Sequence, residues 1–157
     1  MELSPDSEKI LRWIHTISKS RPELGDFSIC PFASLSKHTI INCSIDDITP
    51  IPGYDVIIFI VEDYWSMEEL SSWVDFYNKM YKDYKFFEDS YKNPTYINGV
   101  KTNNDDFNLI LAQPREKLRK FREKLTKTVY YTYWESEYLE KILENDLYLV
   151  KNRKNSG

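Results

Sequence analysis

The stretch FSICPFASLSKH, residues 27–38, holds a cysteine, a proline and a histidine within twelve residues. A cysteine becomes nucleophilic when a helix N-terminus, a cation or a histidine lowers the pKa of its thiol. Lys37 and His38 follow Cys30 closely, and a Cys–His pair is one arrangement used in covalent catalysis. Cys30, as nucleophile or redox centre, and His38, as base, are therefore the candidate catalytic residues. Alternatively this apolar segment closes a core, since free cysteine is often buried. The sequence leaves open whether the protein is an enzyme.

Metal chemistry has little support in the sequence. Structural zinc sites pair their ligands at short, regular spacing, whereas Cys30, Cys43, His15 and His38 are irregularly spaced. Four acidic doublets offer the oxygen ligands that Mg²⁺ or Ca²⁺ would need, but they match no known metal-binding loop. These doublets are Asp46-Asp47, Glu62-Asp63, Glu88-Asp89 and Asp105-Asp106. We therefore predict neither a metal site nor a cofactor.

A basic segment, REKLRKFREKLTK at residues 115–127, carries seven basic residues and two acids. Arg115 comes directly after an expected strand, in the first turn of an expected helix, where backbone N–H groups already favour an anion. An anionic metabolite or an acidic protein surface could bind at this position. The alternative is a solvated helix face with ion pairs such as Glu116–Lys120.

The segment SYKNPTYINGVKTNNDD, residues 90–106, is unusually long for a connection between two strands. Its side chains can hydrogen-bond a polar ligand, and the candidates for ligand binding are Tyr91, Asn93, Tyr96 and Asn98. Together with Arg115 they predict a polar, anion-tolerant site. The alternative is a hairpin extension around Asn98-Gly99 that binds no ligand.

The elements that must position these residues follow from capping signals and periodicity. Ser4-Pro5-Asp6 begins a helix that Pro22 and Gly25 end, and a capping box at Ser66 begins a second helix reaching about residue 82. A third helix covers 115–127 and a last one 136–145. The expected strands are residues 38–45, 55–61, 84–89, 107–112 and 129–134. The run DVIIFIV (55–61) is apolar throughout, which is typical of a strand covered on both faces.

In this order, residues 55–134 form a β-α-β-β-α-β pattern, which is the ferredoxin-like arrangement. The expected fold is therefore α+β: a ferredoxin-like core with an extra strand at 38–45 and additional N- and C-terminal helices. We expect a single domain over residues 1–150 and a disordered basic tail at 151–157. The proposition on which the predicted site depends is that the strands at 55–61 and 107–112 are neighbours, so that the long loop and the helix at Arg115 share one rim.

Charge is distributed unevenly along the chain. Residues 44–106 carry thirteen acids and five bases, whereas residues 107–157 carry eleven bases and seven acids. A pI near 5.3 argues against a nucleic-acid partner. No apolar run approaches the length of a membrane span, and the acidic N-terminus lacks the features of a secretory signal. We expect a soluble, cytoplasmic protein with reduced thiols, and an anionic small molecule or another protein as its partner.

The stretch RWIHTISKSRPELGDFSICPFAS resembles an uncharacterised bacterial family. Members of that family have an N-terminal helix with a Trp-Leu or Trp-Ile pair, followed by a Leu-Cys-Pro-Phe-Ala motif. The matching residues are Trp13-Ile14 and the segment Ile29-Cys30-Pro31-Phe32-Ala33. The Asn-Arg-Ser-Pro element and the histidine of that family are absent from the loop before NLILAQPRE. The resemblance implies no known activity.

Three functions are compatible with these patterns. The first is a small ligand-binding or accessory domain with the polar site described above. The second is a thiol-dependent enzyme or redox protein using Cys30. The third is a protein–protein adaptor that works through its charge asymmetry.

Overall fold

The computed structural model describes residues 4–22, 37–97 and 99–127. The helices are α1 (Pro5–Ile17), α3 (Met67–Met80) and α4 (Arg115–Leu125), with a 3₁₀ turn, η2, at Ile45–Asp47. The strands are β1 (His38–Asn42), β2 (Val56–Ile60), β3 (Tyr84–Ser90), β4 (Tyr96–Ile97), β5 (Val100–Lys101) and β6 (Asn108–Pro114). Within these ranges no helix has the length and apolar character needed to cross a membrane.

Four strands form the main sheet, in the order β1-β2-β6-β3. β1 runs parallel to β2, whereas β6 is antiparallel to both of its neighbours, β2 and β3. The expected α+β class is confirmed, and so is the predicted adjacency of the two apolar strands. Ile58 of β2, for instance, pairs with Leu111 of β6.

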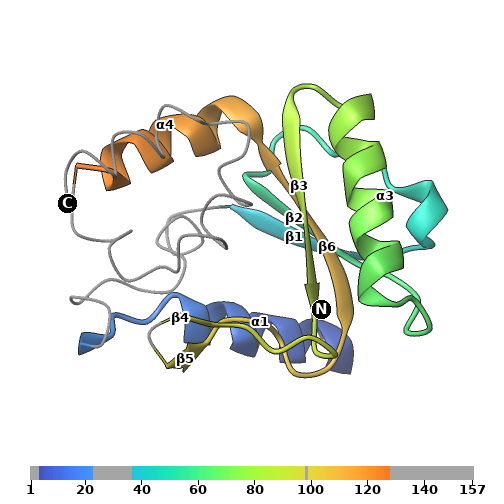
Figure 1. The fold of residues 1–157 in the computed structure, drawn as a ribbon, viewed down its shortest axis with the longest axis horizontal. Helices are drawn as coiled ribbons and strands as arrows, with labels where there is room; N and C mark the ends of the chain where they lie inside the picture. The colour runs from blue at the N-terminus through green and yellow to red at the C-terminus, as the bar shows by residue number, and fades with distance from the viewer. Residues whose placement is uncertain (1–3, 23–36, 98, 128–157) are drawn as a thin grey trace.

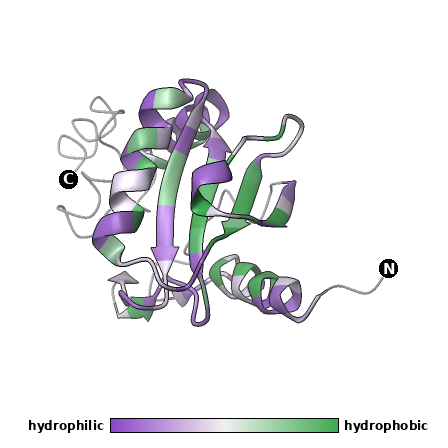
Figure 2. Ribbon diagram, turned by 90° about the vertical axis from the view of Figure 1, so that its right-hand side faces the viewer, coloured by the Kyte–Doolittle hydropathy of each residue, from purple (hydrophilic) through white to green (hydrophobic). Residues whose placement is uncertain are grey.

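Helices cover both faces of this sheet, which explains why β2 is apolar throughout. α3 lies on one face, and α1 and α4 lie on the other (Figure 1). Ile57 and Phe59 belong to the core on the α3 side, whereas Ile58 and Ile60 contribute to the core on the α1 side. The strands at the centre of the sheet are accordingly the most hydrophobic part of the molecule (Figure 2).

Local capping explains where two helices begin. The Ser4 side chain accepts a hydrogen bond from the Ser7 N–H, and Pro5 occupies the first helical position of α1. At α3, Ser66 and Glu69 form the predicted capping box, in which each side chain bonds the backbone of the other residue. The predicted start of both helices is therefore confirmed.

The long connection between β3 and β6 contains the small hairpin that its turn residues predict. β4 and β5 pair antiparallel, and Gly99 between them has a φ of +82°, which a residue with a side chain rarely adopts. The hairpin lies beside α1 in Figure 1. This places part of the long loop against the first helix.

The ferredoxin-like topology is only partly visible. β2, α3, β3, β6 and α4 follow the expected β-α-β-β-α order, and β1 occupies the edge of β2 that faces away from β6. The predicted strand at 129–134, the helix at 136–145 and the tail at 151–157 lie outside the described residues. The complete β-α-β-β-α-β arrangement therefore stays a prediction.

Candidate functional site

Buried asparagines organise the loop that joins β3 to β6. Asn103 and Asn104 are 5% and 2% exposed, although they belong to a polar surface loop. The Asn103 side chain donates to the Ser90 carbonyl at 2.8 Å and accepts from the Thr95 N–H at 3.1 Å. A buried amide that satisfies several partners holds the backbone around it in one conformation. The loop backbone is therefore held in place by buried side-chain hydrogen bonds.

Asn104 connects this loop to the end of β3. Its backbone N–H and its side-chain Nδ2 both donate to Oδ1 of Asp89, at 2.9 and 2.6 Å. Its Oδ1 accepts from the Phe107 N–H at 2.6 Å. Part of Asp89 reaches solvent, but protein surrounds its carboxyl group, and this burial raises the pKa of Asp89 to about 7. The hydrogen bonds from Asn104 act in the opposite direction.

Helix α1 packs against the same loop. The Trp13 indole Nε1 donates to the Thr102 carbonyl at 3.1 Å, and Lys9 lies 4.0 Å from a carboxylate oxygen of Asp106. Ile10 and Ile14, on the adjacent face of the helix, are buried against the sheet. Apolar packing and polar contacts together fix the distance between α1 and the loop.

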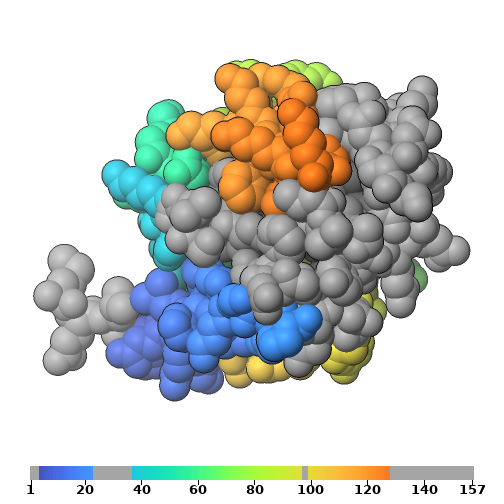
Figure 3. All heavy atoms as spheres, turned by 90° about the vertical axis from the view of Figure 1, so that its left-hand side faces the viewer, coloured from blue at the N-terminus to red at the C-terminus, as the bar shows by residue number. Residues whose placement is uncertain are grey.

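Between α1 and the loop is an open pocket of about 700 Å³. Figure 3 shows this side of the molecule, with α1 in blue and the segment near residue 100 in yellow beneath it. Six charged side chains line the pocket, four basic and two acidic, together with two aromatic rings and several smaller residues. The basic ones are Lys9, Arg12, Arg21 and Lys101, the acidic ones are Asp105 and Asp106, and the rings are Trp13 and Phe107.

One residue that lines the pocket has a buried polar atom without a hydrogen-bond partner. Nε of Arg21 is buried and has no hydrogen-bond partner, although Nη2 of the same guanidinium makes a long contact of 3.5 Å with the Thr16 carbonyl. A buried donor without a partner is unfavourable by about 1–3 kcal/mol, more when the group is charged. Because Nε is shielded from solvent, it is also shielded from any molecule in the pocket, so its missing partner does not by itself indicate a ligand.

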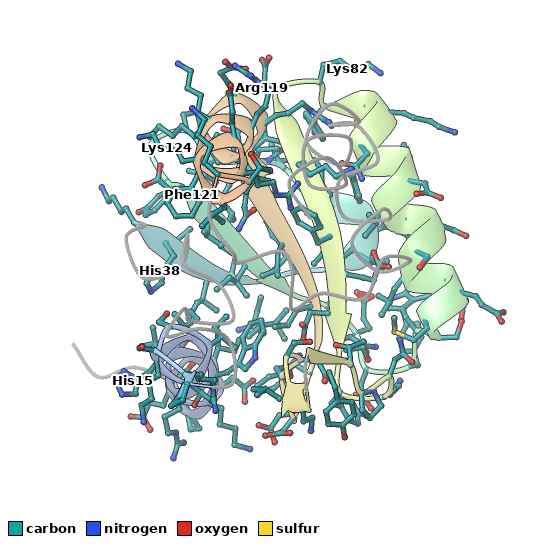
Figure 4. The ribbon with its side chains drawn as sticks, turned by 60° about the vertical axis from the view of Figure 1, so that its left-hand side comes forward. His15, His38, Lys82, Arg119, Phe121 and Lys124 are labelled. Atoms are coloured by element: carbon teal, nitrogen blue, oxygen red, sulfur yellow. The ribbon has the colours of Figure 1, made fainter. Side chains whose placement is uncertain are left out.

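Arg115 does not belong to this pocket. Because β6 pairs antiparallel with β3, the loop 91–107 lies at the start of β6 and Arg115 at its end. Figures 1 and 4 show α4 at one end of the sheet and α1 at the other. Arg115 donates from Nε and Nη2 to the carbonyls of Lys82 and Tyr84, at 3.1 and 3.0 Å. The expectation of one rim shared by the loop and Arg115 is therefore corrected: neighbouring strands do not bring opposite ends together.

The other predicted ligand residues line different surfaces. The Tyr91 hydroxyl donates to Asp63 at 2.7 Å, on the side of the loop next to α3. Asn93 is exposed, and Tyr96 in β4 is 55% exposed. None of these three lines the pocket. Asn98 lies outside the described residues. Whether any of them binds a ligand stays a prediction.

The residues of the predicted thiol site are only partly described. Cys30 lies outside the described residues, and His38 begins β1, where it is half-buried and pairs with Val56. His15 lies on the exposed side of α1, on a different element from His38 (Figure 4). Burial, followed by the carboxylates of Asp47 and Glu62, raises the pKa of Cys43 to about 11. Cys43 is therefore a thiol at neutral pH and not a nucleophile.

In the described ranges, no three His, Cys, Asp or Glu side chains are grouped so as to hold a metal ion. Three of the four acidic doublets instead have a member with a structural partner. Glu62 accepts a hydrogen bond from the Ile45 N–H at 2.8 Å, Asp89 binds Asn104, and Asp105 forms an ion pair with Lys101.

The pocket residues that sequence reasoning missed have a recognisable spacing. Lys9, Arg12, Trp13 and Thr16 follow each other at intervals of three, one and three residues, which places them on one side of α1. This polar side is next to the apolar side formed by Ile10, Ile14 and Ile17. Only the docking of the helix against the loop, which the spacing does not encode, shows that it forms a pocket wall.

No protein-family model, curated protein or solved structure matches this chain. The resemblance to an uncharacterised bacterial family therefore stays a prediction, and a function has to be inferred from the geometry of the pocket.

Proposed function

We propose that the protein is a small ligand-binding domain that holds an anionic small molecule in the pocket between α1 and the loop 91–107. The observation that carries this proposal is the basic lining of the pocket, to which Arg12 and Arg21 contribute guanidinium groups of the kind that suits carboxylates and phosphates. The proposal keeps an anion site at the long loop, but with other residues: Tyr91, Asn93 and Tyr96 do not line the pocket, and α1 replaces the start of α4 as its second wall.

The charges of the lining restrict the kind of ligand. Four basic and two acidic side chains leave a net positive charge, which favours an anion. Asp105 and Asp106 each lie close to a lysine of the same pocket, so part of the positive charge is already neutralised. A small carboxylate or phosphate ester suits this balance, with Arg12 and Arg21 as its principal partners and Trp13 and Phe107 as apolar contacts.

A thermal-shift screen tests the proposal. The probes are inorganic phosphate, pyrophosphate, citrate and a sugar phosphate, each compared at constant ionic strength. We expect at least one of them to raise the melting temperature of the parent protein in a saturable manner. The double variant Arg12→Gln/Arg21→Gln should weaken this binding about tenfold or more, as expected for the loss of charged hydrogen bonds.

A matched control separates a specific site from general charge effects. Lys120 and Lys124 are exposed on α4, at the opposite end of the sheet, and the variant Lys120→Gln/Lys124→Gln removes the same charge. This variant should bind like the parent. If no probe stabilises the parent, or if both double variants lose binding equally, the pocket is not the ligand site.

The fold and location are further parts of this proposal. The β-α-β-β-α order of β2, α3, β3, β6 and α4 supports a ferredoxin-like arrangement, whereas the position of α3 and α4 on opposite faces of the sheet departs from it. A cytoplasmic location is supported by the free thiol of Cys43, which suits a reducing compartment. Pairing of the strand predicted at 129–134 with the main sheet, measured by amide NMR contacts, would test the first part.

The hypothesis of a thiol-dependent enzyme remains a proposal, and it is tested by the reactivity of Cys30. We would measure the alkylation rate of Cys30 in the native protein against pH, with Cys43 as the internal reference. A rapid reaction near neutral pH would support a catalytic thiol. A Cys30 that reacts only after denaturation would be a core residue, and the enzyme hypothesis would be wrong.

A further inference from the structure

A connected row of aromatic side chains runs from the loop before α3 along the edge of the helix, where Tyr77 is buried in the core and Trp65 and Trp73 are half-buried against it. Ring centroids of Tyr64 and Trp65 lie 4.9 Å apart, and those of Trp65 and Trp73 lie 6.4 Å apart. The Trp73 ring lies 5.8 Å from Phe76 and 5.9 Å from Tyr77. The row therefore extends from the β2–α3 connection along one side of the helix.

Two rings of this row, and a methionine on the same helix, are open to solvent. Tyr64 is 71% exposed, Phe76 is 40% exposed and Met80, one turn further along α3, is 51% exposed. Three of the five large apolar side chains that are exposed in the described ranges therefore lie here. Single exposed apolar residues are ordinary on a protein surface, whereas a contiguous group of them indicates an interaction site.

Acids outnumber bases in the segment that carries the aromatic row. Residues 44–80 contain eight acids and a single base, Lys79. Of these acids, Asp55 is paired with Lys117 of α4, and the ammonium group of Lys92 reaches the carbonyls of Asp63 and Trp65 beside the row.

The Tyr64 hydroxyl donates to the Glu62 carboxylate at 3.3 Å. Desolvation and this carboxylate raise the pKa of Tyr64, and the negative charges of Asp46 and Glu69 raise it further.

Glu62 is the carboxylate most firmly held in this group. Burial acts to raise its pKa, but hydrogen bonds from the Ile45 N–H, the Trp65 indole and the Tyr64 hydroxyl outweigh burial and lower the pKa below its ordinary value. Glu62 is therefore charged at neutral pH. The end of the aromatic row at Tyr64 and Trp65 therefore lies against a negative charge that the fold holds in place.

We propose that this face, defined by Tyr64, Trp65, Trp73, Phe76 and Met80 with the carboxylates of Asp46, Asp47, Glu62 and Glu69, docks a basic amphipathic helix of a partner protein. Apolar side chains of such a helix would cover Phe76 and Met80. Its Lys or Arg side chains would contact the carboxylates and the faces of the Trp and Tyr rings. The face lies on the opposite side of the sheet from α1 (Figure 1), so the inference does not depend on the proposed ligand pocket.

A second copy of this chain fits the face less well. The basic helix α4 offers lysines on its surface, but its apolar residues Leu118 and Leu125 are buried. It would bring charge to the face without the apolar side chains that Phe76 and Met80 require.

The experiment uses a fluorescently labelled synthetic amphipathic helix made of Leu and Lys, and a Leu–Glu peptide of the same length, with binding followed by anisotropy. The Leu–Lys peptide should bind the parent protein and the Leu–Glu peptide should not. Binding should weaken about tenfold or more when salt is raised from low to high ionic strength, because exposed charge pairs are screened.

Matched variants locate the binding. Phe76→Ser/Met80→Ser should weaken binding of the Leu–Lys peptide about tenfold or more, whereas Tyr96→Ser, at an exposed aromatic on the β4–β5 hairpin, should not change it. Asp46→Asn/Asp47→Asn should reduce the affinity and the salt dependence together. Equal binding by Phe76→Ser/Met80→Ser and the parent, or binding of the Leu–Glu peptide, would overturn the inference. The inference would also be overturned if sedimentation showed that the parent protein is a dimer and that Phe76→Ser/Met80→Ser abolishes this dimer. The face would then bind a second copy of the chain.

Discussion

Replacing Asp89 with asparagine should stabilise the protein at pH 8. The carboxyl group is surrounded by protein, and this burial raises its pKa from the ordinary value of 3.8 to about 7. The nearby carboxylate of Glu88 adds to this effect, while Lys101 opposes it. The amide introduced by Asp89→Asn would keep an oxygen that accepts both hydrogen bonds from Asn104 and would avoid the cost of burying a negative charge.

The sign of the pH dependence follows from linkage. Between pH 3.8 and pH 7 the folded protein holds a proton on Asp89 that the unfolded chain has released, so the free energy of unfolding falls as the pH rises. At 1.36 kcal/mol for each pH unit, this interval corresponds to about 4 kcal/mol. Because part of Asp89 reaches solvent, screening reduces the effect, and we expect about 2–4 kcal/mol.

Urea unfolding, followed by tryptophan fluorescence at several pH values from 4 to 8, would measure this difference. Parent and Asp89→Asn should have similar stability near pH 4, and the variant should become the more stable one as the pH rises. Asp75→Asn, at an exposed position on α3, is the matched control and should show no such divergence. An Asp89→Asn variant that is less stable than the parent at pH 8 would refute the reasoning, since the charged hydrogen bonds to Asn104 would then outweigh desolvation.

Three further predictions concern single residues. Arg115→Ala should lower the free energy of unfolding by about 1–2 kcal/mol, because the hydrogen bonds to the Lys82 and Tyr84 carbonyls are lost. It should leave anion binding unchanged in a thermal-shift assay, and a loss of binding would contradict the structural role of Arg115. Ser66→Ala should lower the free energy of unfolding by about 1 kcal/mol in urea unfolding, because the capping box at α3 is lost. An unchanged midpoint would show that the cap does not contribute to stability. Cys43 should react slowly with iodoacetamide at pH 8 and much faster in denaturant, since its pKa is about 11; equal rates, by peptide mass spectrometry, would contradict its burial.

The parts of the fold that could be predicted are those decided locally. The apolar run that becomes β2 has hydrophobic residues at every position, which only a strand with two covered faces can accommodate. The caps at Ser4 and Ser66 fix the start of α1 and α3 through hydrogen bonds to residues three positions away. Such short-range constraints can be identified in the sequence.

The site was predicted only in part, because its geometry depends on contacts between distant residues. Placing the long loop and Arg115 together overlooked the length of β6, whose seven residues separate its two ends by about 20 Å. The contact of Trp13 with Thr102 joins residues 89 positions apart. Nothing in the local pattern of either segment indicates that contact, so the pocket could be found only in the folded structure.

The asparagines of the loop illustrate why residue type alone misassigns a role. Asn103 and Asn104 have the same chemistry as Asn93, and any of them could bind a polar ligand. In the structure, Asn103 and Asn104 are buried and satisfy the backbone of their own loop, whereas Asn93 is exposed. Burial, which the sequence does not specify at these positions, decides which asparagine is structural.

The most direct test of the proposed anion pocket is the indole N–H signal of Trp13 in a ¹H–¹⁵N NMR titration. Its Nε1 is bound to the Thr102 carbonyl at the wall of the pocket, and Trp65 and Trp73 lie on the other side of the sheet as internal references. Trp13→Phe assigns the signal. With an anion identified in the thermal-shift screen, the Trp13 signal should move saturably while those of Trp65 and Trp73 stay in place. A Trp13 signal that does not move while the anion stabilises the protein would show that the anion binds elsewhere.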